Sequence, residues 1–555
     1  MASSGRRRSL LHHTSSRHDL ELRAAAPHFG RRRFFTITAA AAALAFTTNL
    51  PARGAAGSSE LDTARIPSDP FTLGIASGDP LPHSVLLWTR LAPAPYQADG
   101  GLPGQYVAVQ WEVATDERFA LTVRTGVAIA YPEYNHSLHV EVDGLDPDRV
   151  YYYRFKAGTW ISETGRTRTA PATTAAAATL TYAAVACQAY FDGYYTVHRH
   201  LAQDDVDVVF HLGDYLYEYA VNSVGGHRNY TDRKLPDLFN HEATTLEDYR
   251  LRYALYKSDP DLRAVHAAHP FVITWDDHET ENNYAGAISE NNDPPETFLL
   301  RRAAAYRAHW ENHPLRNAQL PSGPDMRLYR RLHWGTLAQF DVLDTRQYRS
   351  DQLYNDTKHV VVGPEVDDPS RTMTGAAQES WLIDGWHASE ALWNVMPQQV
   401  CFSQRKLDLN AEAKMSMDAW DGYRASRRRI LDGAKSAGVE NLVVMTGDVH
   451  VGYAFDIKDD FDDPASTALG TEIVATSVAS GRDGAERPPT WDTYLKANPH
   501  LKFYDGRRGY VRVTLDRQKA RADFRTVSAV TTPGAPITTA ASFVTEAGNP
   551  GLKPA

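Results

Sequence analysis

The 555-residue chain contains only two cysteines, Cys187 and Cys401. Two cysteines cannot build the framework of several disulfides that stabilises small secreted domains, although a single bridge between them stays open. The sequence also lacks an apolar stretch long enough to span a bilayer. Hydrophobic residues make up 43% of the chain and charged residues 23%, which is typical of a globular protein and excludes a disordered or collagen-like one. At this length we expect two to four domains.

Acidic residues outnumber basic ones outside the N-terminus. The net charge of the chain is −10, but residues 1–56 contain nine arginines and two acidic residues, so the remainder carries −17. Proteins that bind nucleic acid present a basic surface, and this acidic composition therefore argues against a nucleic-acid-binding protein. It is compatible with carboxylates gathered around cations.

The first 56 residues have the order of a signal peptide. Arg31-Arg32-Arg33-Phe34-Phe35 precedes an apolar stretch at 36–46, and small residues follow at Gly54-Ala55-Ala56. The apolar stretch is too short to span a membrane, so an export signal is predicted; the alternative is a basic disordered tail. The paired arginines resemble a twin-arginine signal, which implies the twin-arginine export machinery as a partner and secretion of a folded, metal-loaded protein to the extracellular space.

Residues 65–172 are predicted to form an N-terminal β-sandwich. Short runs rich in β-branched and aromatic residues, such as 106–113 and 150–155, are separated by turn-forming residues. Several short strands at this spacing indicate a sandwich of about 100 residues. The segment Leu145-Asp146-Pro147, followed by tyrosines at 151–153, resembles the tyrosine corner of fibronectin-type domains.

The pattern changes after an alanine-rich stretch at 171–179, which is typical of a linker. Residues 180–530 contain short apolar runs, typical of buried strands, that alternate with longer helical patterns, and this predicts an α/β domain with one or two mixed sheets. The last segment, 531–555, is expected to be irregular because it contains Pro, Gly and Thr.

Polar, reactive side chains follow four of the apolar runs. Ligands in α/β proteins bind at the carboxyl ends of strands, so these residues are the candidates for a site. The runs are 181–186, followed by Cys187; 206–212, followed by Gly213-Asp214-Tyr215-Leu216-Tyr217; 271–274, followed by Trp275-Asp276-Asp277-His278-Glu279 and Asn282; and 442–445, followed by Thr446-Gly447-Asp448-Val449-His450. Each alone is compatible with a turn or a buried polar residue, but the four together favour a metal centre.

The residue types indicate which metals. Carboxylate and amide oxygens suit hard cations such as Ca²⁺, whereas thiolate and imidazole suit a transition metal. The phenolate of Tyr217 suits a ferric ion because both are hard and charged. Asp214, three residues earlier, can bridge two metals. Two adjacent metals clamp the oxygens of a phosphoryl group and lower the pKa of a water, so the predicted reaction is phosphoester hydrolysis by a metal-activated hydroxide.

The order Gly-Asp-x-x-Tyr, Asp-His-Glu and Gly-Asp-x-His resembles that of calcineurin-like metallophosphoesterases and purple acid phosphatases. With the segments 69–80, 87–93 and 343–349 added, nearly all of the chain after the signal is similar to the PhoD-type alkaline phosphatases and phosphodiesterases. This resemblance implies an α/β metallophosphoesterase sandwich with an N-terminal fibronectin-like β-sandwich domain. Secreted calcium-dependent phospholipases D of actinobacterial type look like members of the same group, so release of phospholipid head groups is the alternative activity.

The resemblance also implies the cofactors, Fe³⁺ and Ca²⁺. Matching positions assign Cys187, Asp214 and Tyr217 to iron. The ligands that would complete the site around both metals are Asp214, Asn282, Asp448 and His450, with their division between the metals left open. Asp277 stands where calcineurin-like enzymes have a metal-binding Asn, so its role and that of Asn282 are open as well. His278 occupies the place of the histidine that meets the leaving group.

Arginine is the expected partner of a substrate phosphate, because guanidinium and phosphate form paired hydrogen bonds. Arg346 and Arg302 are the candidates, with Arg301 as an alternative to Arg302, and structural salt bridges are the competing explanation. Two other classes of function fit the sequence less well. A carbohydrate- or surface-binding protein leaves the four strand-end motifs unexplained, and a phenolate-ligated ferric ion is poorly suited to redox cycling.

Overall fold

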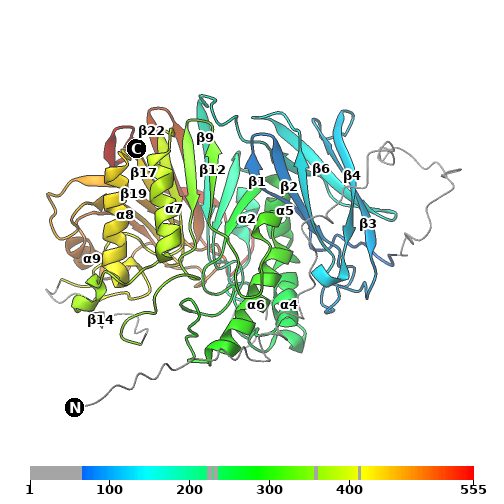
Figure 1. Ribbon diagram of the computed structural model, residues 1–555, viewed down its shortest axis with the longest axis horizontal. Coiled ribbons are helices and arrows are strands. Elements are labelled where there is room, and N and C mark those ends of the chain that lie inside the picture. Colours follow the sequence, from blue (N-terminus) through cyan, green and yellow to red (C-terminus); the bar gives the residue numbers. More distant parts are fainter. Residues whose placement is uncertain (1–65, 222–227, 229–234, 356–359, 410–413) are drawn as a thin grey trace, which may run out of the picture.

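The computed structural model describes residues 66–221, 228, 235–355, 360–409 and 414–555. The predicted signal peptide lies outside these residues. The described chain forms two large β-sheets packed face to face, with helices on the outer sides and a smaller β-sheet at one end (Figure 1). Within it, no helix has the length and apolar character that a membrane span needs.

The first large sheet has ten strands and a parallel centre. In spatial order the strands are β24 (Asn549–Pro554), β23 (Ile537–Glu546), β22 (Lys519–Val527), β21 (Gly509–Asp516), β9 (Thr179–Val185), β10 (Val208–Leu212), β11 (Pro270–Thr274), β1 (Ile75–Leu81), β2 (Ser84–Arg90) and β5 (Ser137–Asp143). β9, β10, β11 and β1 are parallel. β10 and β11 are buried along their whole length, as expected for parallel strands that are covered on both faces.

The second large sheet has seven strands. They are β12 (Arg330–Trp334), β13 (Ala338–Val342), β15 (Trp393–Pro397), β17 (Leu442–Thr446), β19 (Ala468–Val474), β18 (Gly452–Lys458) and β20 (Leu501–Asp505). Side chains of both sheets form one core between them, in which Phe210 stacks on Phe340. The strands predicted at 181–186, 206–212, 271–274 and 442–445 are confirmed as β9, β10, β11 and β17.

Helices cover the outer faces of the two sheets (Figure 1). Those on the first sheet are α2 (Thr196–Leu201), α4 (Leu246–Lys257), α5 (Pro260–Ala268) and α6 (Pro295–Asn312), and those on the second are α7 (Gly375–His387) and α8 (Arg424–Ser436). Thr245 caps α4 by accepting a hydrogen bond from the backbone N–H of Asp248, and the Asp248 carboxylate accepts one from the backbone N–H of Thr245. Each helix layer therefore buries its apolar side against a sheet, and the two large sheets lie between the helix layers.

The N-terminal residues form a β-sandwich whose two sheets differ in kind. One is the small sheet of β4 (Thr122–Ala130), β3 (Val107–Ala114), β6 (Val150–Ala157) and β7 (Trp160–Ile161), with β8 (Gly165–Arg168) paired to β6. The other consists of β1, β2 and β5, which continue the ten-stranded sheet through β11. The hydroxyl of Tyr151 accepts a 2.9 Å hydrogen bond from the backbone of Asp146, the contact expected of a tyrosine corner.

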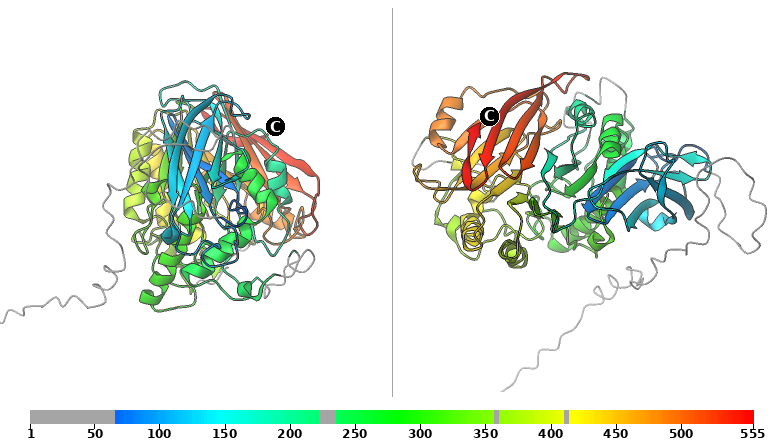
Figure 2. Two further views of the ribbon diagram at one scale, coloured as in Figure 1. Left: turned by 90° about the vertical axis from the view of Figure 1, so that its right-hand side faces the viewer. Right: turned by 90° about the horizontal axis from the view of Figure 1, so that it is seen from above.

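The C-terminal residues differ from the irregular segment expected of them. They form β23 and β24, which extend the ten-stranded sheet beside β22. Gly534 and Gly548 lie in the connections, whereas Pro550 and Gly551 lie within β24 itself. Gly548 has a φ of 73° in the turn between the two strands, where glycine carries little strain. Figure 2 shows these red strands and the blue N-terminal strands at opposite ends of the molecule. The domain boundaries near 172 and 530 stay predictions.

A buried ion pair joins the N-terminal strands to the second sheet. The carboxylate of Asp79, on β1, accepts hydrogen bonds of 2.8 and 2.7 Å from Arg330 on β12. We expect Asp79→Asn to lower the free energy of unfolding by about 3–5 kcal/mol, because the Arg330 charge stays buried without its partner. Asn tolerates the left-handed φ of 42° at this position. Urea unfolding followed by circular dichroism measures the change.

The control for this prediction is Asp146→Asn. Asp146 pairs with Arg149 on the surface, at 2.9 Å, with side-chain exposures of 73% and 47%. Exposed pairs of this kind contribute about 0–1 kcal/mol. Equal losses of stability in the two variants would contradict the role assigned to the buried pair.

Candidate metal centre

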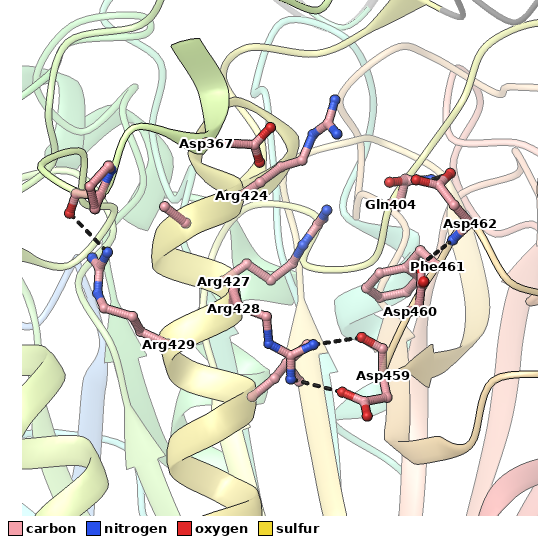
Figure 3. A pocket seen from close by; sticks show the side chains of 13 residues that line it. Asp367, Gln404, Arg424, Arg427, Arg428, Arg429, Asp459, Asp460, Phe461 and Asp462 are labelled. Atoms are coloured by element: carbon pink, nitrogen blue, oxygen red, sulfur yellow. Dashed lines mark hydrogen bonds and ion pairs between the residues drawn. The ribbon is translucent and has the colours of Figure 1, made fainter. Parts of the chain in front are cut away.

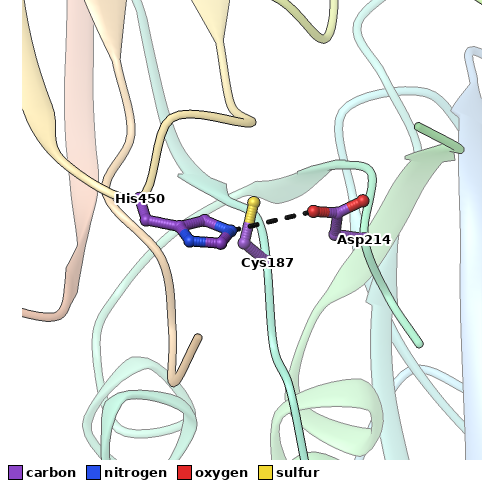
Figure 4. A group of neighbouring side chains, drawn as sticks. All are labelled: Cys187, Asp214 and His450. Carbon is purple, nitrogen blue, oxygen red and sulfur yellow. Dashed lines mark ion pairs between the residues drawn. The ribbon is translucent and has the colours of Figure 1, made fainter. Parts of the chain in front are cut away.

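Cys187, Asp214 and His450 meet at the carboxyl ends of β9, β10 and β17 (Figure 4). One donor atom from each side chain lies within 4.8 Å of the other two. The loops that carry Cys187 and Asp214 are tied together, because the backbone N–H of Cys187 donates to the Gly213 carbonyl at 3.1 Å. Two neighbouring parallel strands of the first sheet, together with β17 of the second, thus bring sulfur, oxygen and nitrogen donors from three distant parts of the chain to one point.

The backbone at these positions is strained. Cys187, Asp214, Asp448 and His450 have φ angles of 56°, 54°, 64° and 57°. Residues other than glycine rarely occupy this left-handed region, at a cost of about 1–3 kcal/mol each, and they do so mainly at functional sites. Four such residues at neighbouring strand ends mean that the backbone is bent so that their side chains converge.

Tyr217 belongs to the same group. Its hydroxyl donates to Asp214 Oδ2 at 2.9 Å and lies 3.0 Å from His450 Nε2, while Ser480 Oγ donates to it at 2.8 Å. Burial, and after it the Asp214 carboxylate, raises the pKa of the Tyr217 hydroxyl and of the Cys187 thiol well above their usual values. A strongly positive charge at this point is therefore needed to stabilise a thiolate and a phenolate here.

A second group of donors adjoins the first and consists of Asp214, Asp277 and His278. Buried carboxylate oxygens of Asp214 (Oδ1), Asp276 (Oδ2) and Asp277 (Oδ1) have no hydrogen-bond partner within the described ranges. Leaving such atoms without a partner is costly. Oxygens of this kind are the ligands of hard cations, so the donor set fits a metal ion beside the Cys187 group.

Arg346 neutralises part of this negative charge. Its fully buried guanidinium donates to Asp276 and, at 2.8 Å, to Asp418, and it lies 3.5 Å from Asp277 and 3.8 Å from Asp448. Even so, burial, and then the neighbouring Asp418, raises the pKa of Asp448 to about 7. One arginine does not balance these carboxylates, and a bound cation would lower the pKa values by supplying the missing positive charge.

The contacts of the two candidate arginines bear on the two explanations offered for them. Arg346 is fully buried and enclosed by carboxylates, the setting of a buried counter-charge. Arg302 donates to the carbonyls of Pro324 at 2.9 Å and Gly286 at 2.6 Å, so it holds two loops together. These contacts favour the structural explanation for both. Arg301 likewise pairs with Glu281 at 2.7 Å.

Asn282 is held in place by two glutamates. Its side-chain amide donates to Glu290 at 2.6 Å, and its backbone N–H donates to Glu218 at 2.8 Å. Glu218 also accepts a 2.8 Å hydrogen bond at Oε2 from Nδ1 of His278. The backbone of Asn282 therefore supports the Glu218–His278 pair. Glu290 holds the side-chain nitrogen of Asn282, so Oδ1, the atom with which an amide binds a cation, stays the candidate ligand atom.

Several residues of this site are missed by the sequence motifs. They are Glu218, Asp418 and Ser480, of which only Glu218 adjoins a motif, directly after Tyr217. Glu279, which was part of a motif, turns out to organise the backbone: its carboxylate accepts from the N–H groups of Asp214, Tyr215 and Asp276 at 3.1, 2.6 and 2.8 Å. It fixes the loops after β10 and β11 relative to each other.

A hollow of about 590 Å³ lies apart from these donors, between the first turns of α8 and the acidic turn at 459–462 (Figure 3). Its charged groups pair largely with one another and with neighbouring acids. Arg428 binds Asp459 at 2.8 Å, and Arg429 binds Glu379 at 2.7 Å. Its lining residues are all different from the candidate metal ligands, so the site described above is the one that concentrates reactive groups.

Comparison with known proteins agrees with this geometry. Residues 182–524 match the model of the PhoD-like phosphatase family, and residues 55–171 match that of the PhoD-like phosphatase N-terminal domain. Alkaline phosphatase D of Bacillus subtilis (strain 168) is 47% identical over 530 residues, which is 95% of this chain and 89% of that protein. A solved structure of PhoD is 48% identical, has a TM-score of 0.84, and matches over 88% of this chain and 92% of its own.

The fold is accordingly an α/β metallophosphoesterase sandwich with an N-terminal fibronectin-like β-sandwich, and the candidate metal ligands lie at the rim of its large sheets. One family model matches each of the two parts of the molecule, and both relatives match over most of the chain. These matches show that the chain belongs to the PhoD-like phosphatase family of phosphoester hydrolases.

Proposed function

We propose that the protein is a secreted alkaline phosphatase or phosphodiesterase that hydrolyses phosphate esters with a metal-activated hydroxide. The observation that carries this proposal is the meeting of thiol, phenol, carboxylate and imidazole donors at one buried point. We assign Fe³⁺ to Cys187, Asp214, Tyr217 and His450, because thiolate and imidazole suit a transition metal and phenolate suits its ferric state. We assign Ca²⁺ to the all-oxygen group around Asp277 and Asp448.

In the proposed mechanism the metals and the side chains have different roles. When bound, the ions would neutralise the phosphoryl oxygens and make a water acidic enough to attack phosphorus. Asp214 belongs to both groups of donors and so connects them. Arg346 keeps the surrounding carboxylates in place, since it pairs with Asp276 and Asp418 without meeting solvent.

His278 is the proposed general acid. Burial alone would lower its pKa, but the carboxylates of Glu218, Asp277 and Asp214 outweigh burial and raise the pKa well above the usual value. These carboxylates therefore favour the protonated imidazole, the form that a general acid needs. Its Nδ1 is held by Glu218 at 2.8 Å, which leaves Nε2 to donate a proton to the oxygen of the leaving group.

Export is part of the proposal. Arg31-Arg32-Arg33-Phe34-Phe35 and the apolar stretch after it support recognition by the twin-arginine machinery, which carries folded proteins. Such a route is consistent with metals that are inserted before export. Release of the head group of a phospholipid is the alternative reaction of the same centre.

Elemental analysis combined with three substrates tests the proposal. Iron near one per chain is expected, with calcium-dependent hydrolysis of p-nitrophenyl phosphate, of its bis-ester or of phosphatidylcholine. The preferred substrate separates the phosphatase, phosphodiesterase and phospholipase activities. A protein purified without metal that turns over none of the three after iron and calcium are supplied would contradict the proposal.

A further inference from the structure

Ser480 lies outside every motif of the sequence but touches the centre of the site. It follows β19 in a loop and is completely buried. Its hydroxyl is 2.8 Å from the phenol oxygen of Tyr217, and its own oxygen accepts a 2.9 Å hydrogen bond from the backbone N–H of Ala189. The side chain therefore connects the loop after β9 with the phenol that follows β10.

The direction of these hydrogen bonds is fixed by counting hydrogens. A serine hydroxyl has one hydrogen to donate. The N–H of Ala189 can only donate, so it occupies an acceptor position of Ser480 Oγ, and the serine hydrogen is left for Tyr217. The hydrogen of the phenol itself is directed to Asp214 at 2.9 Å. When Tyr217 loses that hydrogen, the Ser480 hydroxyl continues to donate to the phenolate oxygen.

The backbone holds Ser480 in this orientation. Its carbonyl accepts from Ser477 Oγ at 2.6 Å and from the guanidinium of the buried Arg508. Its N–H donates to the carbonyl of Cys187 at 3.2 Å. A loop that is fixed from three sides, and that contacts two of the proposed iron ligands, is suited to hold a donor in place at low entropic cost.

We infer that Ser480 is a positioning residue that donates a hydrogen bond to the phenolate of Tyr217 and thereby sets its strength as an iron ligand. The inference rests on the proposed assignment of Fe³⁺ to Tyr217. A hydrogen bond stabilises the lone pairs of a phenolate, so it raises the energy of charge transfer from phenolate to Fe³⁺. Partners of this kind also orient the ligand, and their loss typically weakens metal binding about 10–100-fold.

Absorption spectroscopy of the iron-loaded, full-length protein tests the inference. Ser480→Ala is expected to move the phenolate-to-iron band to longer wavelength and to weaken iron retention against a chelator about 10–100-fold. Ser477→Ala is the matched control, since Ser477 supports the same loop without contacting the phenol. Its band is expected to stay at the wild-type wavelength. An unshifted band in Ser480→Ala, or an equal shift in both variants, overturns the inference.

Two further variants separate the possible failures. Tyr217→Phe should abolish the band; if iron-loaded wild type has no band that this change removes, the iron assignment itself fails. If Ser480→Ala does not fold, Ser480→Thr keeps the hydroxyl and is expected to keep the wild-type wavelength, whereas Ser480→Cys, a weaker donor, is expected to shift the band. A Thr variant shifted as far as the Cys variant would count against the inference.

Discussion

Replacing Cys187 with alanine is expected to remove iron from the purified protein and to lower phosphoester hydrolysis by more than about 100-fold. Cys187 supplies the only sulfur in the group that it forms with Asp214 and His450. Loss of residues that merely support a ligand already costs about 10–100-fold, so loss of a ligand should cost more. Iron content and kcat for p-nitrophenyl phosphate should be measured on the same sample.

Cys401→Ala is the matched control for this prediction. Cys401 is also completely buried, but its sulfur lies 3.6 Å from the carbonyl of Ser403, in a separate apolar cluster. It is expected to keep both iron and activity. Alanine at position 187 has the same left-handed φ to adopt as cysteine, so backbone strain is not a confounding difference. Full activity in Cys187→Ala would refute the iron assignment.

Replacing His278 with glutamine is expected to lower kcat by about 10²–10⁴-fold while iron and calcium stay bound. The loss should be larger for an alkyl phosphate than for p-nitrophenyl phosphate, because an alkoxide needs a proton to leave and p-nitrophenolate does not. A general acid predicts this difference between substrates, whereas a purely structural residue predicts equal losses. Steady-state kinetics with both substrates distinguishes the two.

Glu218→Gln tests the role of His278 as general acid by removing the carboxylate that pairs with it. Without the carboxylate the pKa of His278 falls, so the protonated imidazole is lost at a lower pH. The high-pH limb of the kcat profile for the alkyl substrate should therefore move to lower pH. Glu242→Gln removes an acid that pairs with Arg301 outside the metal-ligand groups and should leave the profile where it is. Profiles that coincide for wild type and Glu218→Gln would contradict the role of the pair.

The ligands at strand ends could be predicted from the sequence because parallel strands leave a local signal. A short apolar run followed at once by Cys187, or by Gly-Asp before Tyr217, shows both the strand and the group that it delivers. Asp418 and Ser480 have no such signal. They come from loops whose position depends on packing between distant elements, and a single aspartate or serine in a loop is common in any sequence.

The fold shows the same division between local and distant information. The sandwich strands and the tyrosine corner follow from alternation and turn residues. The pairing of β1 with β11 places Ser77 beside Pro270, which is distant in the sequence, and it has no local signature. The hairpin of β23 and β24 was obscured because the Pro and Gly residues within β24 and in the connections beside β23 resemble those of an irregular tail.

The pairing of β21 with β9 has a consequence for how the protein matures. Val511 lies opposite Ala184, and the carbonyl of Cys187 accepts a hydrogen bond from Val478, so the strand that precedes the first metal ligand is supported by residues made about 300 positions later. At about 5–20 residues per second, the ribosome needs roughly 15–65 s to pass from β9 to β21. Contacts between residues this far apart in sequence also form slowly during folding. A nascent chain that already contains every proposed ligand, up to His450, therefore still lacks the strand that pairs with β9, and we expect the proposed metals to be inserted only after β21 has been made.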